Sequence, residues 1–178
     1  MLTNTRHRYG LIAILLHWVG ALTIGYMWLS GKNFGGLGGS HHATHIAIGS
    51  GLAFLLLARV LWGALSTHPE PLNSSRALNL VASAVKGLLL LDILAVVTTG
   101  FLSVWLRGNA VNVFGLYSIA SPLVADERWV RLAGGIHELG ANLFFPLVGL
   151  HVLGALKHMV FDRDGTFSRM VWPRGESA

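Results

Sequence analysis

The sequence predicts an all-α membrane protein, in which a bundle of four transmembrane helices forms a single domain over residues 1–178. The chain is 53% hydrophobic and only 12% charged, about half the charged fraction of an ordinary soluble domain. Its mean hydropathy is +0.58. Several apolar runs reach about 20 residues, which is enough to cross a bilayer. The length suits one bundle and leaves no room for a separate soluble domain.

Four apolar runs define the expected spans. The first, about residues 9–29, is too long for the core of a signal peptide, so we expect it to remain as a span that ends in a glycine-rich turn. The second, about residues 42–64, stops at the proline-flanked stretch STHPEPLNSS. The third, about residues 85–106, precedes a long mixed connection. The fourth, about residues 132–161, exceeds the minimum span, so we expect it to tilt or to project from the membrane.

The distribution of basic residues predicts the orientation, because four spans place both termini on one side. That side collects nine of the thirteen lysines and arginines, namely Arg6, Arg8, Arg59, Arg76, Lys86, Lys157, Arg163, Arg169 and Arg174. The other side has Lys32, Arg107, Arg128 and Arg131. The positive-inside rule therefore places both termini in the cytoplasm. The net charge of +5 is then explained by the basic loops that set this orientation; membrane lipid is an expected partner, and no nucleic-acid partner is expected.

The chain has no cysteine and nine histidines. The absence of cysteine excludes disulfides, thiolate metal sites, iron–sulfur clusters and cysteine nucleophiles. Histidine is the remaining strong nitrogen ligand, and an ionisable residue inside a membrane is by default a functional candidate.

Four histidines fall at two matched depths in the expected spans. His17 and His151 lie near the cytoplasmic level, whereas His45 and His137 lie near the outer ends of their spans. Fourteen residues separate His137 from His151, so they share nearly one helix face at levels roughly 21 Å apart. Two haems, each bound by two histidines, would fit this pattern. Interhelical hydrogen bonding is the alternative for any single histidine, and a zinc centre would need all its ligands in one place.

Several motifs resemble the bacterial cytochrome b561 family, with the greatest likeness to a member that oxidises superoxide. They are LLHW at 15–18, THIAIGSGLAFLLLARVLW at 44–62, RGN at 107–109, FGL at 114–116 and IHELGANLFFPLVGLHVLGALKHMVFDRDGTFSRM at 136–170. The resemblance covers almost the whole chain. It implies a four-helix cytochrome with two b-type haems, one bound by His17 and His151 and the other by His45 and His137.

The third span departs from the family pattern. Members usually have a histidine near its start and a tyrosine and a proline within it. This chain instead has Lys86, Asp92 and the sequence Val97-Thr98-Thr99. The departure does not concern the predicted haem ligands. It concerns the substrate that the family would bind at the cytoplasmic end.

Ionisable residues near the cytoplasmic level are candidates for propionate and quinone contacts. Arg59 lies fourteen residues after His45 on nearly the same face, where it could pair with a haem propionate or simply extend to the lipid headgroups. His158 and Lys157 follow His151, and His158 could donate a proton to a quinone. The resemblance implies ubiquinone near this position. Asp92 could relay a proton there, and an Asp92–Lys86 contact is an equal alternative.

On the outer side, Arg107, Arg128 and Arg131 are expected, with Lys32, to surround the mouth of the outer haem pocket. Such a basic funnel would concentrate a small anion such as superoxide, although ordinary interfacial arginines would look the same. The sequence thus predicts an enzyme, a superoxide:ubiquinone oxidoreductase. The alternatives are a membrane electron-transfer subunit that serves a dehydrogenase-type protein partner, and a proton-relaying transporter, which the paired depths disfavour.

Overall fold

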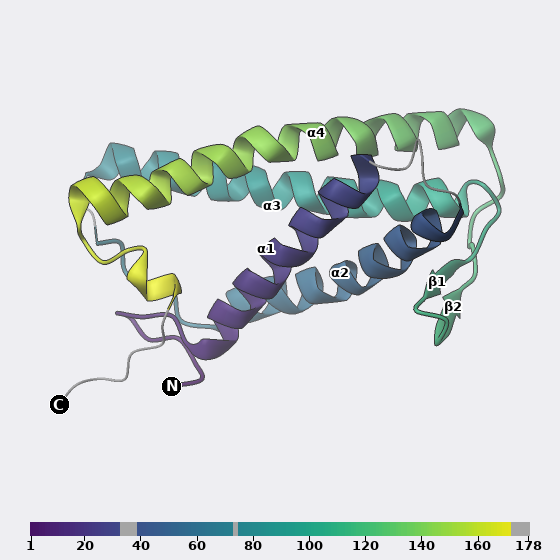
Figure 1. Cartoon of the computed structure of the whole chain (residues 1–178). Helices are drawn as coiled ribbons and strands as arrows, with labels where there is room; N and C mark the ends of the chain where they lie inside the picture. Colours follow the sequence, from purple (N-terminus) through teal and green to yellow (C-terminus); the bar gives the residue numbers. More distant parts are fainter. Residues whose placement is uncertain (33–38, 73–74, 172–178) are drawn as a thin grey trace.

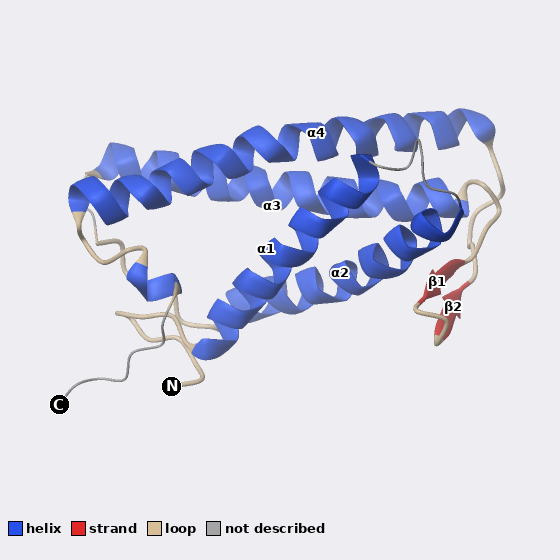
Figure 2. Cartoon of the chain, in the orientation of Figure 1, coloured by secondary structure: helices blue, strands red, loops and turns tan. Residues whose placement is uncertain are grey.

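The computed structural model describes residues 1–32, 39–72 and 75–171, and four long helices dominate it (Figures 1 and 2). The helices are α1 (Leu11–Lys32), α2 (Gly39–Leu65), α3 (Arg76–Trp105) and α4 (Glu127–Lys157). The shorter elements are the strands β1 (Val111–Val113) and β2 (Tyr117–Ile119), the π-helical turn η1 (His158–Asp162) and the 3-10 turn η2 (Ser168–Met170). Most of the predicted glycine-rich turn, and Arg174, lie outside the described residues.

Two of the helices begin earlier than their apolar runs. Helix α3 begins at Arg76 rather than near residue 85, because the Ser75 side chain accepts a hydrogen bond from the Leu78 backbone N–H. Helix α4 begins at Glu127 rather than near residue 132, because Asp126 caps the first turn through the Arg128 and Trp129 N–H groups. A capping side chain satisfies backbone donors that the helix leaves unpaired. Hydropathy locates the membrane-embedded part of a helix and misses this polar extension.

The four helices are long and apolar enough to cross a membrane, and most of their surface faces outward. The candidate spans are Leu11–Lys32, His42–Leu65, Arg76–Trp105 and Glu127–Asp162. Large apolar side chains such as Leu22 and Leu91 are exposed along them. A soluble protein would not leave so much apolar surface in water, so we treat the chain as a multi-pass membrane protein. The all-α, four-helix prediction is confirmed at this level.

The helices pack as two antiparallel pairs (Figure 1). Helix α3 runs along α4 for most of its length, whereas α1 packs mainly on α2. The small buried core lies between the pairs, where Leu52 and Leu56 of α2 meet Ile93 of α3. Contact between α2 and α3 is otherwise sparse.

One end of the bundle, here called the terminal end, gathers the N-terminal segment and the last described residues before 172. The Trp18 indole N–H donates to the Met170 carbonyl at 2.7 Å. Arg169 donates to the Glu70 carbonyl at 2.9 Å, and the Glu70 N–H donates to the Arg6 carbonyl at 2.8 Å. The N-terminal segment, the connection between α2 and α3, and the segment after η1 are thus tied together.

The opposite end, here called the hairpin end, has the antiparallel β1–β2 hairpin, which the sequence predicted only as a long connection. Val111 pairs with Ile119 and Val113 with Tyr117. The hairpin packs against α2, and Val111 is only 1% exposed. Its tip has Phe114 and Gly115 at positive φ, which fits a tight reversal of the chain.

Candidate functional site

Two histidine pairs lie inside the bundle, one toward each end. At the terminal end, the rings of His17 (α1) and His151 (α4) have centroids 6.1 Å apart and planes 64° apart. At the hairpin end, the rings of His45 (α2) and His137 (α4) have centroids 6.1 Å apart and planes 76° apart. These are called the terminal-end pair and the hairpin-end pair. The structure brings together the same histidines that share a depth in the sequence.

The spacing within each pair suits a metal ion held from both sides. An imidazole nitrogen lies about 2 Å from a bound first-row metal, so two rings on opposite sides of one ion have centroids roughly 6 Å apart. The two pairs are separated along α4 by fourteen residues, or roughly 21 Å of helical rise. The arrangement therefore provides two separate two-nitrogen sites and no single four-ligand site.

At the hairpin end, both rings have their Nδ1 atoms engaged by hydrogen-bond acceptors. The His137 Nδ1 lies 2.8 Å from the Val96 carbonyl oxygen, to which it donates. The His45 Nδ1 lies 3.2 Å from the Ser30 hydroxyl, which donates its own proton to the Met27 carbonyl at 3.0 Å. A ring that donates through Nδ1 keeps a lone pair on Nε2. Metal-binding histidines in proteins are commonly oriented in this way.

Two glycines allow other helices to approach the hairpin-end pair closely. A Cβ at Gly100 of α3 would lie 3.1 Å from the Cε1 atom of His137, which is tighter than normal packing. A Cβ at Gly31 of α1 would lie 3.6 Å from the Cε1 atom of His45. Sequence reasoning missed Gly100, Ser30 and the Val96 carbonyl, because no sequence pattern shows which α3 residues face which α4 residues.

At the terminal end, a cation lies beside the histidine pair. The Arg59 guanidinium of α2 is 3.4 Å from the His17 Nδ1. A guanidinium can only donate, so this nitrogen of His17 accepts. One turn after Arg59, the buried indole N–H of Trp62 has no hydrogen-bond partner among the described residues.

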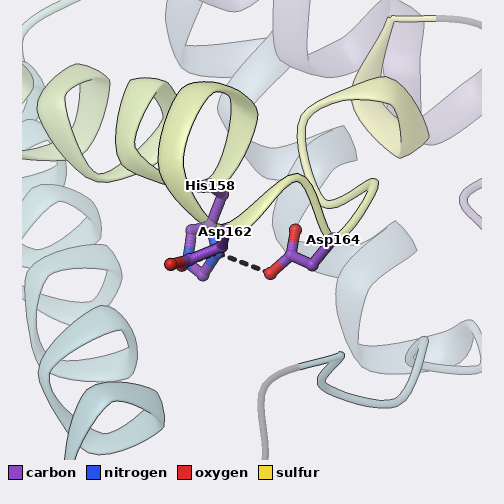
Figure 3. A group of neighbouring side chains, drawn as sticks. All are labelled: His158, Asp162 and Asp164. Atoms are coloured by element: carbon purple, nitrogen blue, oxygen red, sulfur yellow. Dashed lines mark hydrogen bonds and ion pairs between the residues drawn. The ribbon is translucent and has the colours of Figure 1, made fainter.

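His158 belongs to a compact polar cluster with Asp162 and Asp164 just beyond α4 (Figure 3), and Lys157, the last residue of α4, joins it. The His158 Nδ1 lies 2.7 Å from the Asp164 carboxylate and 3.1 Å from the Asp162 carboxylate. The Lys157 ammonium lies 2.6 Å from Asp162. The atoms of His158, Asp162 and Asp164 that could ligate a metal ion all lie within 4.8 Å of one another. The hydrogen bonds and ion pairs within the cluster already engage these atoms. Sequence reasoning identified the two bases and missed the acids that hold them.

The Asp164 carboxyl is ionised at neutral pH. Burial alone would raise its pKa, but hydrogen bonds from the Thr166 N–H and hydroxyl and from His158 outweigh that effect and lower the pKa below its usual value. Because a depressed carboxyl pKa stabilises the fold only while the group is charged, the His158–Asp164 contact persists at neutral pH. It is lost only as the pH falls through that lowered pKa.

Asp92 lies apart from the His158 cluster. Its carboxylate faces Gly140 of α4, where a Cβ would lie 3.3 Å from the Asp92 Oδ1. Gly140 precedes His158 by eighteen residues, or roughly 27 Å of helical rise. The Asp92 Oδ2 is buried without a hydrogen-bond partner among the described residues, and no ion pair there joins Asp92 to Lys86. Asp92 therefore cannot share a site with His158.

The three arginines expected at the outer mouth are exposed at the hairpin end. Arg107 and Arg128 lie on adjoining segments, because the Asp126 N–H donates to the Leu106 carbonyl at 3.0 Å. Arg131 is partly neutralised by Glu127, 3.7 Å away. Lys32 does not join this group. Its ammonium contacts Asn142 of α4 and lies 5.7 Å from the centre of the Trp28 ring.

Comparisons with known proteins match nearly the whole chain. The sequence profile of a family described as prokaryotic cytochrome b561 matches residues 8–173. Cytochrome b561 homolog 2 of Escherichia coli K12 is 34% identical over 176 residues, which cover 95% of this chain and 94% of that protein. The matched region includes all four helices and both histidine pairs.

Proposed function

Because the chain belongs to the prokaryotic cytochrome b561 family, we propose that each histidine pair binds one haem b and that the protein transfers electrons across the membrane. The observation that carries this proposal is the pair of equal 6.1 Å ring spacings inside a four-span bundle. His17 and His151 would hold one haem, and His45 and His137 the other. Without cysteine there is no covalent attachment.

The residues around the pairs fit this cofactor. At the hairpin end, Val96 and Ser30 orient the two rings so that Nε2 can ligate. At the terminal end, Arg59 and the unpartnered indole N–H of Trp62 are suitable donors for haem propionates. Haem supplies a one-electron carrier, and two protein ligands leave no open position for a gas.

We propose superoxide as the electron donor and ubiquinone as the acceptor. In the balanced reaction, two superoxide anions each lose one electron and become O₂, while one ubiquinone takes two electrons and two protons and becomes ubiquinol. Arg107, Arg128 and Arg131 are exposed at the hairpin end, where their charge would draw in a small anion. Arg131 contributes least because Glu127 lies beside it.

We place the quinone site at the terminal end, beside His158 and Lys157. His158 is hydrogen-bonded to an ionised Asp164. It can therefore donate a proton to a reduced quinone and then take up another proton from the water layer. This assignment leaves Asp92 out of the quinone site, where the sequence alone had placed it. It also puts the terminal end in the cytoplasm of a bacterial inner membrane, in agreement with the positive-inside rule.

A second function is favoured by the exposed apolar hairpin. Leu116 is 89% exposed and Tyr117 is 68% exposed at the end that has the arginines. Such a surface would suit a protein partner, so the chain could instead be the membrane electron-transfer subunit for a dehydrogenase-type protein. The two functions differ in whether the isolated protein can take electrons from superoxide.

The deciding experiment uses purified protein with both haems bound, a superoxide source and excess ubiquinone. We expect catalytic ubiquinol formation that slows as ionic strength rises. The Arg107→Gln/Arg128→Gln variant should be slower, whereas Arg76→Gln, an exposed arginine on α3 at the terminal end, should match the wild type. Ubiquinol formation no faster than the uncatalysed background would support the partner-dependent function instead.

The quinone site has its own test. We expect His158→Leu to reduce the rate of ubiquinone reduction at least tenfold while both haems stay bound and are still reduced from the hairpin end. The effect follows from removing the proton donor, which typically contributes 10²–10⁴-fold or so. A wild-type rate of quinone reduction in this variant would place the site elsewhere.

A further inference from the structure

Asp92 is the ionisable group of the interior that the proposed reaction does not use. Its Oδ2 is fully buried and has no hydrogen-bond partner among the described residues. A buried polar atom without a partner is costly, and a buried unpaired charge is more so. A residue that destabilises the fold in this way and lies inside a membrane span is a candidate for function.

The position of Asp92 ties it to the hairpin-end pair. On α3 it lies one turn from Val96, whose carbonyl accepts the hydrogen bond from the His137 ring. On α4 it faces Gly140, three residues from His137, or about 4–5 Å of helical rise. Gly140 lies eleven residues from His151, or roughly 16 Å. Asp92 is therefore much nearer to the hairpin-end pair than to the terminal-end pair.

No fixed positive charge neutralises Asp92. Helix α4 presents Gly140 to it, and α2 meets the adjacent Ile93 with Leu52 and Leu56. The titratable and charged groups described on the elements packed here are Glu127, Arg128, Arg131, His137, Glu138, His151 and Lys157 on α4, His42, His45 and Arg59 on α2, and Arg76 and Lys86 on α3 itself. None of them forms an ion pair with Asp92 among the described residues. The charge state of Asp92 is therefore sensitive to a charge that changes nearby.

We infer that Asp92 is a proton-binding site coupled to the oxidation state of the haem at the hairpin-end pair. This inference rests on the proposed haem ligation by His45 and His137. A ferric haem held by His45 and His137 as neutral ligands would supply a net positive charge there, which reduction by one electron would cancel. The Asp92 carboxylate then loses its compensating charge and binds one proton from water. On oxidation the electron and the proton leave together.

Two hydroxyl groups lie on the same face of α3 between Asp92 and the hairpin end. Thr99 and Ser103 lie seven and eleven residues after Asp92, which places them on its side of the helix. Both are half-buried, and Ser103 donates to the Thr99 carbonyl at 2.8 Å.

The test measures the midpoint potential of each haem against pH in the purified two-haem protein. We expect the hairpin-end haem potential to fall with pH by up to about 59 mV per unit, the value for one proton per electron. Asp92→Asn should lower this slope for that haem and leave the slope of the terminal-end haem unchanged, whereas Asp92→Glu should retain the slope. An unchanged slope in Asp92→Asn would overturn the inference.

A second measurement does not depend on a variant. Infrared difference spectra of the wild type, reduced minus oxidised, should show a gained carboxylic-acid band that shifts in D₂O. If no such band appears while both haems are present and reducible, the inference fails and the proposed function stands. A preparation that cannot bind a second haem would overturn the proposed ligation and the coupling together.

Discussion

The two histidine pairs share one ring spacing and differ in what contacts the other ring nitrogen. At the hairpin end, the Nδ1 atoms of His137 and His45 face acceptors, the Val96 carbonyl and the Ser30 hydroxyl. At the terminal end, the Nδ1 of His17 faces a donor, the Arg59 guanidinium. When Nδ1 accepts a hydrogen bond, the single proton of the neutral imidazole lies on Nε2, the atom that would bind iron.

If each pair binds a haem as proposed, this difference means that the two sites are organised to different degrees before that cofactor arrives. Hydrogen bonds from the protein already hold the hairpin-end rings in a ligating form. The terminal-end site reaches that form only when Arg59 leaves His17 for another partner, and an anionic propionate is the partner that haem itself provides. We therefore expect the hairpin-end site to fill first when haem is added to the haem-free protein.

The largest expected effect comes from removing a ligand. His45→Ala or His137→Ala should abolish haem binding at the hairpin end alone, and His17→Ala or His151→Ala should abolish it at the terminal end alone. The check is the haem-to-protein ratio with reduced-minus-oxidised spectra of the four variants. Matching spectral losses for His17 and His45 would show that the pairs are assigned wrongly.

Replacing Arg59 separates two accounts of the terminal end. If Arg59 moves to a propionate, Arg59→Gln should weaken haem binding there by roughly 10–100-fold, as is typical of lost supporting contacts. Haem titration monitored by absorbance measures this. If Arg59 instead stays on His17 in the haem-bound protein, the variant should bind haem more tightly, because the competing donor has been removed.

A smaller effect is expected from Ser30→Ala, which removes the acceptor for the His45 ring. Haem affinity at the hairpin end should fall by roughly tenfold, since the ring is no longer fixed in one tautomer and orientation. Ser103→Ala is the matched control, because Ser103 also bonds to a backbone carbonyl but, among the described residues, has no hydrogen bond to either histidine pair. Equal losses in the two variants would mean that Ser30 matters only for folding.

The smallest effect should come from Gly100→Ala, whose new methyl group would press on the His137 ring. We expect about 1–3 kcal/mol of destabilisation from overpacking and a shifted spectrum for the hairpin-end haem alone. Gly87→Ala, on the same helix, meets nothing within 4 Å and should leave the spectrum unchanged. Thermal unfolding and low-temperature absorbance spectra would compare the two.

Much of this arrangement could be predicted from the sequence, because its determinants are one-dimensional. Apolar run length predicts four spans, and counting residues along each span matches His17 with His151 and His45 with His137. The depth of Asp92 could not be assigned in this way. Its place beside Gly140 depends on how α3 and α4 align, and that alignment follows from where Ser75 and Asp126 start the two helices.

The residues that support the histidine pairs and His158 could not be predicted from the sequence either. Ser30 and the Val96 carbonyl act through contacts between helices, and a backbone carbonyl has no sequence signature at all. His158 and Lys157 were recognised as basic groups near a membrane surface, but their acidic partners Asp162 and Asp164 come into range only because η1 and the turn at Arg163 bring the chain back.

The most direct test of the central claim is the haem content of the purified wild-type protein, measured by the pyridine haemochrome method against protein concentration. Two non-covalent b-type haems per chain, both low-spin in the oxidised state, are the predicted result for two histidine-paired sites. One haem or none in protein supplied with excess haem would contradict the account, as would a second haem with an open, gas-binding position.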